Sequence, residues 1–193
     1  MAIDLPAGRQ AALLEYLSLL AKWNQTYNLT AIHDPDRMLT HHLLDSLAVL
    51  PHIGPGPLLD VGSGAGLPGL PLAIARPELA VSVMDASQKK CGFMQQVAIE
   101  LKLKNVHVVH TRAEHFRQEG GFPQIISRAF SELREFIQLT RHLLAAGGEW
   151  LAMKGLYPDE EITHLQGASL KRDVRLHIPY LDADRHLIVM EAV

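Results

Sequence analysis

The sequence predicts an α/β fold, in which a mostly parallel seven-stranded sheet carries helices on both faces and follows a helical extension. Three observations support this prediction. Short apolar runs alternate with amphipathic segments, a glycine-rich turn follows the first apolar run, and the last two runs are separated by a few polar residues. The alternation predicts parallel strands joined by helices, and the final pair of runs predicts an antiparallel hairpin.

The first part of the chain is predicted to be helical. Leucines recur at helical spacing in the segment "RQAALLEYLSLLAKWN". The pair Asp34-Pro35 opens a second helix, because proline is favoured in the first helical turn. The run "GPGP" at residues 54–57 is a linker. We therefore expect a helical N-terminal extension over residues 1–53 and one compact unit over residues 54–193.

Strands and helices alternate in the second unit. Strands are expected at residues 57–61, 80–85, 106–110, 124–130 (with the turn that follows), 149–155, 174–181 and 185–193. Helices are expected at residues 69–77, 88–102, 133–144 and 159–168, with Gly147-Gly148 as a helix stop. In such sheets ligands bind beyond the carboxyl ends of the strands, so the side chains at those ends are the first candidates for a site.

Composition and charge narrow the class of protein. Hydrophobic residues make up 48% of the chain and charged residues 20%, as in ordinary globular proteins. The formal net charge of −3 argues against nucleic-acid binding by overall charge, although a local basic face is compatible with the sequence. The single cysteine, Cys91, and the lack of a recognisable signal peptide or membrane span predict a cytoplasmic protein. The 11 histidines form no metal-binding pattern, so no metal is expected.

The turn "DVGSGAG" is compatible with two cofactors. The overlapping "GAGLPG" fits the GxGxxG pattern of dinucleotide sites, whereas an acid two residues before GxGxG is typical of S-adenosylmethionine sites. Asp60 would attract the ammonium of a methionine tail and repel a pyrophosphate, and Pro68 lacks an N–H that a pyrophosphate site would use. Asp85, which ends the next strand, would accept ribose hydroxyls from either cofactor. These residues favour S-adenosylmethionine, with a dinucleotide as the alternative.

Seven segments in a fixed order indicate a family: "WNQTYNLTAI", "HHLLDSLAVL", "LLDVGSGAGLPGLPLAIARPEL", "KNVHVVHTRAE", "ISRAF", "LAMKG" and "RHLIVM". They run from Trp23 to Met190 and resemble the bacterial ribosomal RNA small subunit methyltransferase G family, also called glucose-inhibited division protein B. The resemblance implies a Rossmann-like, S-adenosylmethionine-dependent enzyme that methylates N7 of a guanine in 16S ribosomal RNA. It also implies the small ribosomal subunit as the partner, and we expect the chain to be a monomer.

The resemblance further implies which residues hold the cofactor. Gly62 would lie against its methionine part, and Leu67 would pack nearby. Asp85 would bind the ribose, and Ala113 and Glu114 would border the adenine. The full set expected at the cofactor is Asp60, Gly62, Gly64, Gly66, Leu67, Asp85, Ala113, Glu114 and Arg128.

The implied reaction needs no general base, because guanine N7 carries a free lone pair and no proton. Amine methyltransferases usually have an Asn/Asp-Pro-Pro-aromatic turn after the fourth strand, where this chain has "SRAF", which favours a ring nitrogen as acceptor. Catalysis would then rest on positioning and desolvation, with Arg128 acting through the cofactor carboxylate or the base O6. The residues expected at the acceptor, an unpaired or extruded base, are Asn28, His42, Asp45, Lys154, Arg185 and His186.

Three other functions compete with this interpretation. A different S-adenosylmethionine-dependent methyltransferase would act on another RNA or on a small molecule, and its binding to a small molecule would depend little on salt. A non-catalytic RNA-binding module would not need the three glycines and Asp85. A nicotinamide oxidoreductase would bind a dinucleotide tightly.

Overall fold

The computed structural model describes residues 4–130 and 132–193. The strands are β1 (Leu58–Val61), β2 (Val81–Asp85), β3 (Val106–His110), β4 (Phe122–Ser127), β5 (Leu144–Lys154), β6 (Ala168–Arg175) and β7 (His186–Ala192). The α-helices are α1 (Ala7–Tyr27), α2 (Pro35–Met38), α3 (Asp45–Leu47), α4 (Gly69–Ala75), α5 (Gln88–Glu100), α6 (Leu133–Thr140) and α7 (Asp159–Thr163). A π-helix, η1 (Leu39–Leu44), joins α2 to α3, and short 3₁₀ turns lie at η2 (Leu50–His52), η3 (Ala113–His115) and η4 (Arg141–Leu143).

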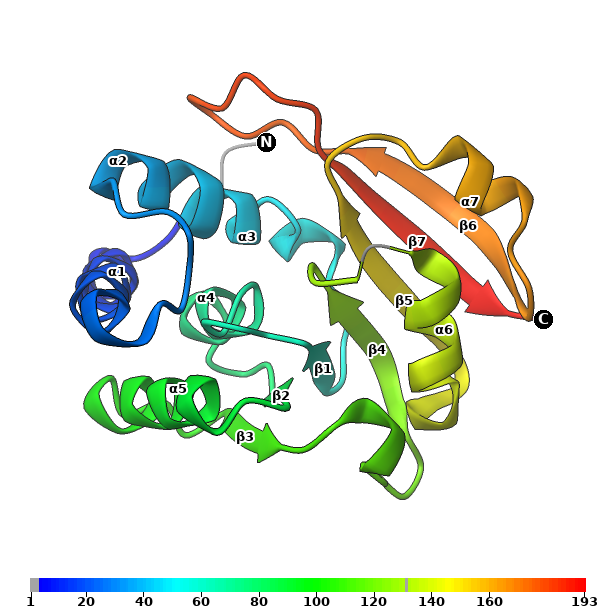
Figure 1. Ribbon diagram of the computed structural model, residues 1–193, viewed down its shortest axis with the longest axis horizontal. Coiled ribbons are helices and arrows are strands. Elements are labelled where there is room, and N and C mark those ends of the chain that lie inside the picture. Colours follow the sequence, from blue (N-terminus) through cyan, green and yellow to red (C-terminus); the bar gives the residue numbers. More distant parts are fainter. Residues whose placement is uncertain (1–3, 131) are drawn as a thin grey trace.

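The strands form one seven-stranded sheet in the order β3-β2-β1-β4-β5-β7-β6 (Figure 1). Strands β1 to β5 pair in parallel, whereas β7 runs antiparallel to both β5 and β6. The predicted α/β fold with a mostly parallel sheet and a C-terminal antiparallel pair is therefore confirmed. The chain order reverses between β1 and β4, and this switch point is where such sheets bind ligands.

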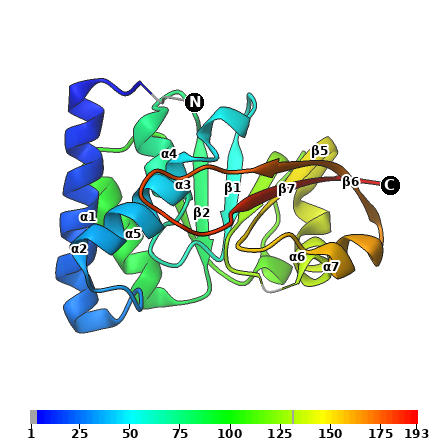
Figure 2. The ribbon, with the colours of Figure 1, turned by 90° about the horizontal axis from the view of Figure 1, so that it is seen from above.

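Helices cover both faces of the sheet. Helices α1 to α5 lie on one side and helices α6 and α7 on the other (Figures 1 and 2). Strand β1 divides its side chains between two apolar cores, because alternate residues of a strand point to opposite faces. Leu58 packs in the core under α4 and α5, while Leu59 and Val61 pack in the core under α6. Asp60 therefore points toward the α4 side.

The N-terminal helix α1 shares its core with the sheet. Leu13, Tyr16 and Leu20 are buried in the cluster that also contains residues of α4 and α5. The Tyr16 hydroxyl donates a hydrogen bond to the carbonyl oxygen of Ala65 at 2.8 Å, within the glycine-rich turn. Helix α1 thus supports that turn directly. The boundary at residue 54 stays a prediction, and residues 1–3 of the expected extension lie outside the described residues.

The second helix begins as predicted. The Asp34 side chain accepts a hydrogen bond from the Arg37 backbone N–H at 2.8 Å, and Pro35 is the first helical residue. The helix then widens into the π-helix η1 before it continues as α3. Wide π turns are rare and often occur at functional sites. This one places His41, His42 and Asp45 toward the carboxyl ends of the strands, as described below.

Several sequence-based element boundaries are wrong. Strand β6 spans 168–175 rather than 174–181, because it is an exposed edge strand whose polar alternation hides its apolar face. The connection to β7 is consequently a ten-residue loop, 176–185, and not a short turn. Gly147-Gly148 lie inside β5, since α6 already ends at Thr140 and η4 follows it. The weak helix expected at 159–168 is confined to α7.

Candidate active site

The glycine-rich turn joins β1 to α4 and has the backbone shape that its glycines allow. Gly62, Gly64 and Gly66 have φ angles of +70°, +61° and +83°. A Cβ atom at Gly62 would lie 2.9 Å from the Cβ of Ala129, so a side chain there would collide with the segment after β4. A Cβ atom at Gly64 would meet no atom closer than 4.0 Å. The turn therefore lies tightly against the segment after β4 at one glycine and borders open space at another.

Ser63 fixes this turn to the neighbouring strand. Its backbone N–H donates to the Met84 carbonyl oxygen at 2.9 Å, and its hydroxyl oxygen accepts from the Met84 N–H at 3.1 Å. The same hydroxyl donates to the Asp60 carbonyl oxygen at 2.9 Å. Ser63 was not among the residues expected at the site, although a polar residue between glycines in a buried turn is a usable signal.

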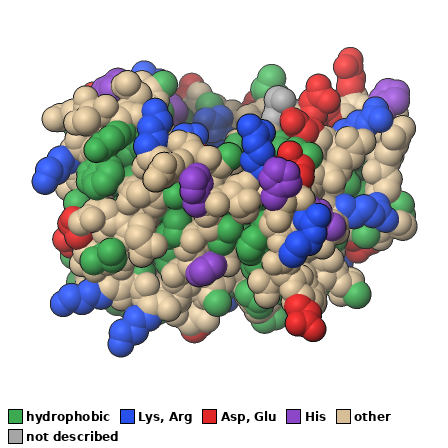
Figure 3. All heavy atoms as spheres, turned by 60° about the horizontal axis from the view of Figure 1, so that its bottom comes forward, with side chains coloured by type: hydrophobic (Ala, Val, Ile, Leu, Met, Phe, Trp, Pro, Cys, Tyr) green, Lys and Arg blue, Asp and Glu red, His purple; other side chains and the backbone are tan. Residues whose placement is uncertain are grey.

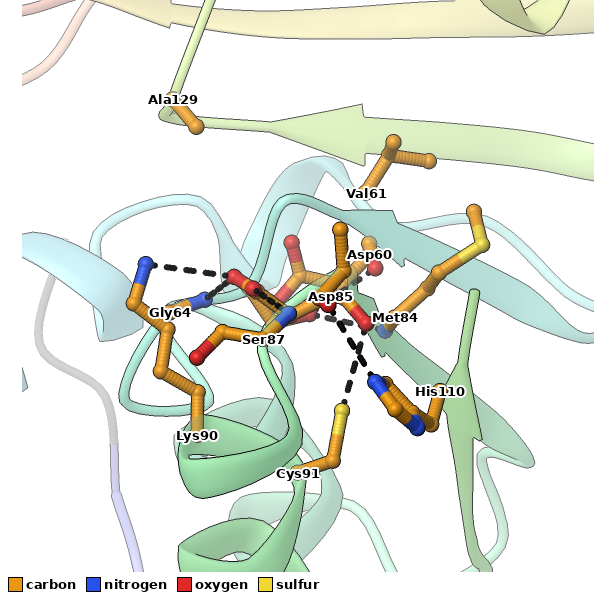
Figure 4. A network of polar contacts seen from close by, with 12 residues as sticks. Asp60, Val61, Gly64, Met84, Asp85, Ser87, Lys90, Cys91, His110 and Ala129 are labelled. Carbon is orange, nitrogen blue, oxygen red and sulfur yellow. Dashed lines mark hydrogen bonds and ion pairs between the residues drawn. The ribbon is translucent and has the colours of Figure 1, made fainter. Parts of the chain in front are cut away.

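Asp85 ties the end of β2 to the turn (Figure 4). Its carboxylate accepts from the Gly64 N–H at 3.0 Å and from the Ser87 N–H at 2.9 Å, and Lys90 Nζ lies 3.5 Å away. Because a carboxylate offers about four acceptor positions, a further hydroxyl donor can still bind to it. Its position, at a strand end beside the turn, fits the ribose-binding role expected of it.

A groove of about 240 Å³ opens beside the turn. Its wall combines turn backbone, the segment after β4 and polar side chains from the N-terminal part and α5. The lining residues are Leu29, Thr30, His42, Gly62, Ser63, Gly64, Ala65, Leu67, Lys90, Arg128 and Ala129. Four residues expected at the cofactor, Gly62, Gly64, Leu67 and Arg128, thus lie together. Thr30, Lys90 and Ala129 also line the groove, although they were not among the residues expected at the cofactor.

Asp60 is fully buried and lies outside the wall of this groove. Its carboxylate accepts a hydrogen bond from the Gly69 N–H at 2.8 Å, at the first residue of α4. Burial raises the pKa of Asp60 to about 7, although the Gly69 hydrogen bond opposes this rise. The observed role of Asp60 is therefore to support the turn and α4, and its contact with a methionine ammonium stays a prediction.

The raised pKa of Asp60 predicts a specific pH dependence of stability. The folded-state pKa lies above the unfolded value, so between about pH 4 and about pH 7 Asp60 is ionised in the unfolded chain while it is still protonated in the folded protein. This difference lowers the free energy of unfolding as pH rises through that range. An Asp60→Asn variant is expected to lack this loss, which is on the order of 4 kcal/mol over that range. Urea unfolding of both proteins between pH 4.5 and about 7.5 measures the difference. Parallel stability curves for the two proteins would contradict the assignment, because all other titrating groups are common to both.

Ala113 and Glu114 follow β3 and form the turn η3. Ala113 is buried in the core under α6, and Glu114 is exposed. Strand β3 pairs with β2, with His110 beside Asp85, so both residues lie beyond the same sheet edge as Asp85. Neither lines the groove, and their contact with an adenine stays a prediction. Gly66 also lies outside the wall, within the turn itself.

A second, polar pocket of about 360 Å³ adjoins the groove and shares His42 and Arg128 with it. Its lining residues are Ile32, His41, His42, Asp45, Arg128, Met153, Lys154, Gly155, Leu176, Arg185 and His186. Five of the six residues expected at the acceptor are therefore brought together. The sixth, Asn28, does not line either pocket; it ends α1 in the left-handed conformation, with φ +49°, and is exposed.

Asp45 links two arginines across this pocket. Its Oδ2 accepts from Arg128 Nη1 at 3.1 Å and its Oδ1 accepts from Arg185 Nε at 3.1 Å. Arg128 Nη1 also donates to the carbonyl oxygen of His41 at 3.0 Å, in the π-helix. The Asp45 side chain is only 4% exposed, whereas the two arginines are 27% and 25% exposed. A buried carboxylate thus holds three distant parts of the chain together, and we refer to Arg128, Asp45 and Arg185 as the Asp45 bridge.

Other polar groups of the pocket also have partners, although His42 Nδ1 is buried without one. His42 Nε2 lies 2.8 Å from Thr30 Oγ1, and burial together with the Arg128 charge lowers the pKa of His42 to about 4. His42 is therefore neutral at neutral pH. Lys154 Nζ donates to both carboxylate oxygens of Glu161 at 3.0 and 3.2 Å. His186 Nδ1 lies 2.9 Å from Asp173 Oδ1.

A larger hollow, of about 1020 Å³, lies elsewhere. It is a leucine-lined groove between α1, the π-helix and the chain around the end of β6. Among its lining residues only Leu176 also borders the polar pocket, and none borders the groove beside the glycine turn. Size alone therefore does not identify the site in this molecule, whereas the chemistry at the strand ends does.

Metal ligands, membrane spans, the cysteine and the surface charge also bear on the class of protein. Within residues 4–130 and 132–193, no cluster of three His, Cys, Asp or Glu side chains is placed to hold a metal ion, and no helix has the length and apolarity to cross a membrane. Cys91 is buried in α5, where its thiol donates to the Asp85 carbonyl oxygen at 3.3 Å and burial raises the pKa of the thiol. On the face shown in Figure 3, Lys and Arg side chains are spread among uncharged and histidine side chains rather than gathered in one patch.

Solved structures with a similar fold are methyltransferases. A methyltransferase from Geobacter sulfurreducens, solved with S-adenosyl-L-homocysteine, matches with a TM-score of 0.59 at 13% identity, over 100% of both chains. A methyltransferase from Aquifex aeolicus matches with a TM-score of 0.59 at 19% identity, over 81% of this chain and 93% of that one. This fold, with the glycine turn and Asp85 at its strand ends, is the Rossmann-like fold that these S-adenosylmethionine-dependent methyltransferases share.

Closer relatives show the family. The family described as GidB, rRNA small subunit methyltransferase G, matches residues 9–188. The ribosomal RNA small subunit methyltransferase G of Methylobacillus flagellatus is 55% identical over 100% of this chain and 93% of its own length. The protein of the same name from Chromobacterium violaceum is 52% identical over 98% of this chain and 92% of its own length. The chain belongs to the rRNA small subunit methyltransferase G family.

Proposed function

We propose that this enzyme transfers a methyl group from S-adenosylmethionine to N7 of a guanine in small-subunit ribosomal RNA. The observation that carries the proposal is the junction of two pockets. The groove beside the glycine turn and the polar pocket meet at His42 and Arg128, so a donor in one lies next to an acceptor in the other. The family to which the chain belongs supplies the class of acceptor.

The residues of the groove fit the proposed cofactor. Gly62 and Gly64 offer backbone without side chains, and Leu67 adds an apolar side chain to the wall. Asp85 does not line the groove, but it is bonded to Gly64 of the wall and has acceptor positions left for hydroxyl donors. S-Adenosylmethionine supplies an electrophilic methyl group on a sulfonium. The chain contributes binding and orientation, and the closely packed turn excludes water from one side of the groove.

The polar pocket suits an acceptor that loses no proton before it reacts. His42 is neutral, its Nε2 faces Thr30, and its Nδ1 is buried although it has no hydrogen-bond partner. The carboxylate of Asp45 is occupied by two guanidinium groups. Neither residue therefore presents an open basic atom to an acceptor in the pocket. A guanine N7 lone pair requires none. Arg128, at the junction, would act as a positioning residue, through the cofactor carboxylate or the base O6.

RNA binding would combine a local basic edge with access to an unpaired or extruded base. Arg128, Lys154 and Arg185 border the pocket, so affinity for RNA is expected to fall as salt concentration rises. The cytoplasmic location and the monomeric state stay predictions from the sequence.

The proposal is tested by incubating the purified protein with S-adenosylmethionine and either small ribosomal subunits or protein-free 16S RNA. The RNA is then digested to nucleosides and analysed by mass spectrometry. The expected product is 7-methylguanosine at one site. Methylation of another nucleoside, or of a small molecule alone, would replace the proposed acceptor, whereas binding of NAD in place of S-adenosylhomocysteine in calorimetry would replace the proposed cofactor.

A further inference from the structure

The loop between β6 and β7 is held firmly at its base. The Leu176 N–H donates to the Arg185 carbonyl oxygen at 2.7 Å, and Arg175 pairs with Asp184 at 2.6 Å. Ile178 is only 3% exposed. Figure 1 shows this loop extending beyond the sheet on the side of α2 and α3. The tip that follows Ile178 is therefore projected from a fixed base.

The tip is a tight turn with an unusual residue in it. The Leu181 N–H donates to the Ile178 carbonyl oxygen at 3.2 Å, which closes a four-residue turn over Pro179 and Tyr180. Tyr180 has φ +64°. Proline in the second position excludes the mirror-image turn types that need positive φ there, so this is a type II turn. The third position of a type II turn favours glycine, because a Cβ atom there strains the backbone. Here it carries a tyrosine.

The tyrosine ring is hardly buried by the rest of the protein, so little packing energy offsets the backbone strain. Tyr180 is 92% exposed, more than any other large hydrophobic residue that is exposed among those described. By contrast, Tyr16 and the indole of Trp150 are fully buried and hydrogen-bonded. A residue that strains its backbone and leaves its ring in water points to a partner outside the chain.

The loop also starts and ends at the polar pocket. Leu176 and Arg185, at its two ends, both line that pocket. Tyr180 is four residues from Leu176, so its Cα lies at most about 14 Å from that of Leu176. A ligand that fills the pocket with one base and continues as a chain would therefore pass near the tyrosine.

We propose that Tyr180 stacks on an unpaired nucleotide of the RNA substrate. This nucleotide lies close to the base held in the polar pocket, as its neighbour in the strand or a few nucleotides away. Unpaired RNA bases stack on exposed aromatic rings, and this contact does not depend on base identity. The inference rests on the proposed function, because it names a second contact of the same RNA. It assigns substrate affinity, rather than the methyl-transfer step, to this loop.

Glycine is the informative substitution at this position, because it removes the ring and also relieves the backbone strain. The Tyr180→Gly variant is expected to fold at least as stably as the parent and to bind S-adenosylhomocysteine equally well. With the RNA substrate that the parent methylates, KM is expected to rise about 10-fold, with kcat nearly unchanged. A Tyr180→Phe variant keeps a stacking ring and is expected to behave like the parent. The matched control is Ile99→Ala, which removes another exposed side chain, from α5.

The outcomes separate this inference from the proposed function. If the parent does not methylate RNA at all, the proposed function fails. If the parent methylates RNA and Tyr180→Gly keeps its KM, only the stacking contact is wrong. An equal loss in Tyr180→Phe would overturn stacking in favour of a hydroxyl contact. If KM rises with assembled subunits while affinity for protein-free RNA is unchanged, the ring contacts a ribosomal protein and the inference is overturned.

Discussion

A Gly62→Arg variant is expected to bind S-adenosylhomocysteine at least about 100-fold more weakly than the parent, a loss of about 3 kcal/mol. Two features of the turn predict this effect. Gly62 has φ +70°, which strains any residue with a side chain, and its Cβ would lie 2.9 Å from that of Ala129. The arginine side chain would also enter the groove that Gly62 lines. Calorimetry with S-adenosylhomocysteine measures the loss, and methylation of RNA is expected to disappear with it.

The control must show that the site, not the fold, is lost. Gly92 lies inside α5, and a Cβ atom there would meet nothing within 4 Å. Gly92→Ala is therefore expected to leave ligand binding unchanged and to raise helix stability by about 0.5–1 kcal/mol. Circular dichroism of Gly62→Arg is expected to retain the α/β spectrum. Full ligand affinity in a folded Gly62→Arg protein would show that the cofactor lies elsewhere.

An Asp45→Ala variant is expected to lower kcat/KM for RNA methylation on the order of 100-fold and to destabilise the fold by about 2–3 kcal/mol. Removing the carboxylate leaves Arg128 and Arg185 facing each other without the buried acceptor that now bonds to both. Because both guanidinium groups are about one-quarter exposed, water compensates for part of the loss. The expected loss of stability is therefore below that of a fully buried pair. Steady-state kinetics and urea unfolding measure the two effects.

A comparison variant distinguishes the bridge from ion pairing in general. Glu78 pairs with Arg76 at 3.1 Å but is 67% exposed, so Glu78→Ala is expected to change neither stability nor activity appreciably. Asp45→Asn, which keeps the shape but loses the charge, is expected to fall between the parent and Asp45→Ala. Equal activity of Asp45→Ala and the parent would remove the Asp45 bridge from the site.

The features that lie at the ends of single strands could be predicted from the sequence. The glycine turn and Asp85 follow apolar strands directly, and parallel strands place their carboxyl ends at one edge, so their meeting was predictable. His42, Lys154 and Arg185 were named as candidates around the acceptor, and the structure brings them together at one pocket.

Other features depend on contacts that no local pattern encodes. Asp45 and Arg185 are 140 residues apart, and nothing in either segment specifies the other. The π-helix that places His41 and Asp45 looks like an ordinary helix in the sequence. Strand β6 was misplaced because an edge strand with solvent on one side carries "KRD" in its middle. Asp60 has a side chain that is chemically suited to bind a methionine ammonium. Its burial could not be predicted, because it depends on how α4 packs against β1.

The position of β7 also determines the order in which parts of the fold can form during synthesis. This strand lies between β5 and β6, although both precede it in the chain, and Arg185 comes immediately before it. While the chain emerges from the ribosome, β1 to β4 and the glycine turn are synthesised before β7 and can pair with one another before it is present. Until residues 186–192 have been translated, β5 has an unpaired edge and Asp45 has no second arginine. A nascent chain can thus form the groove beside the glycine turn before the polar pocket, whose Asp45 bridge is complete only once β7 is in place.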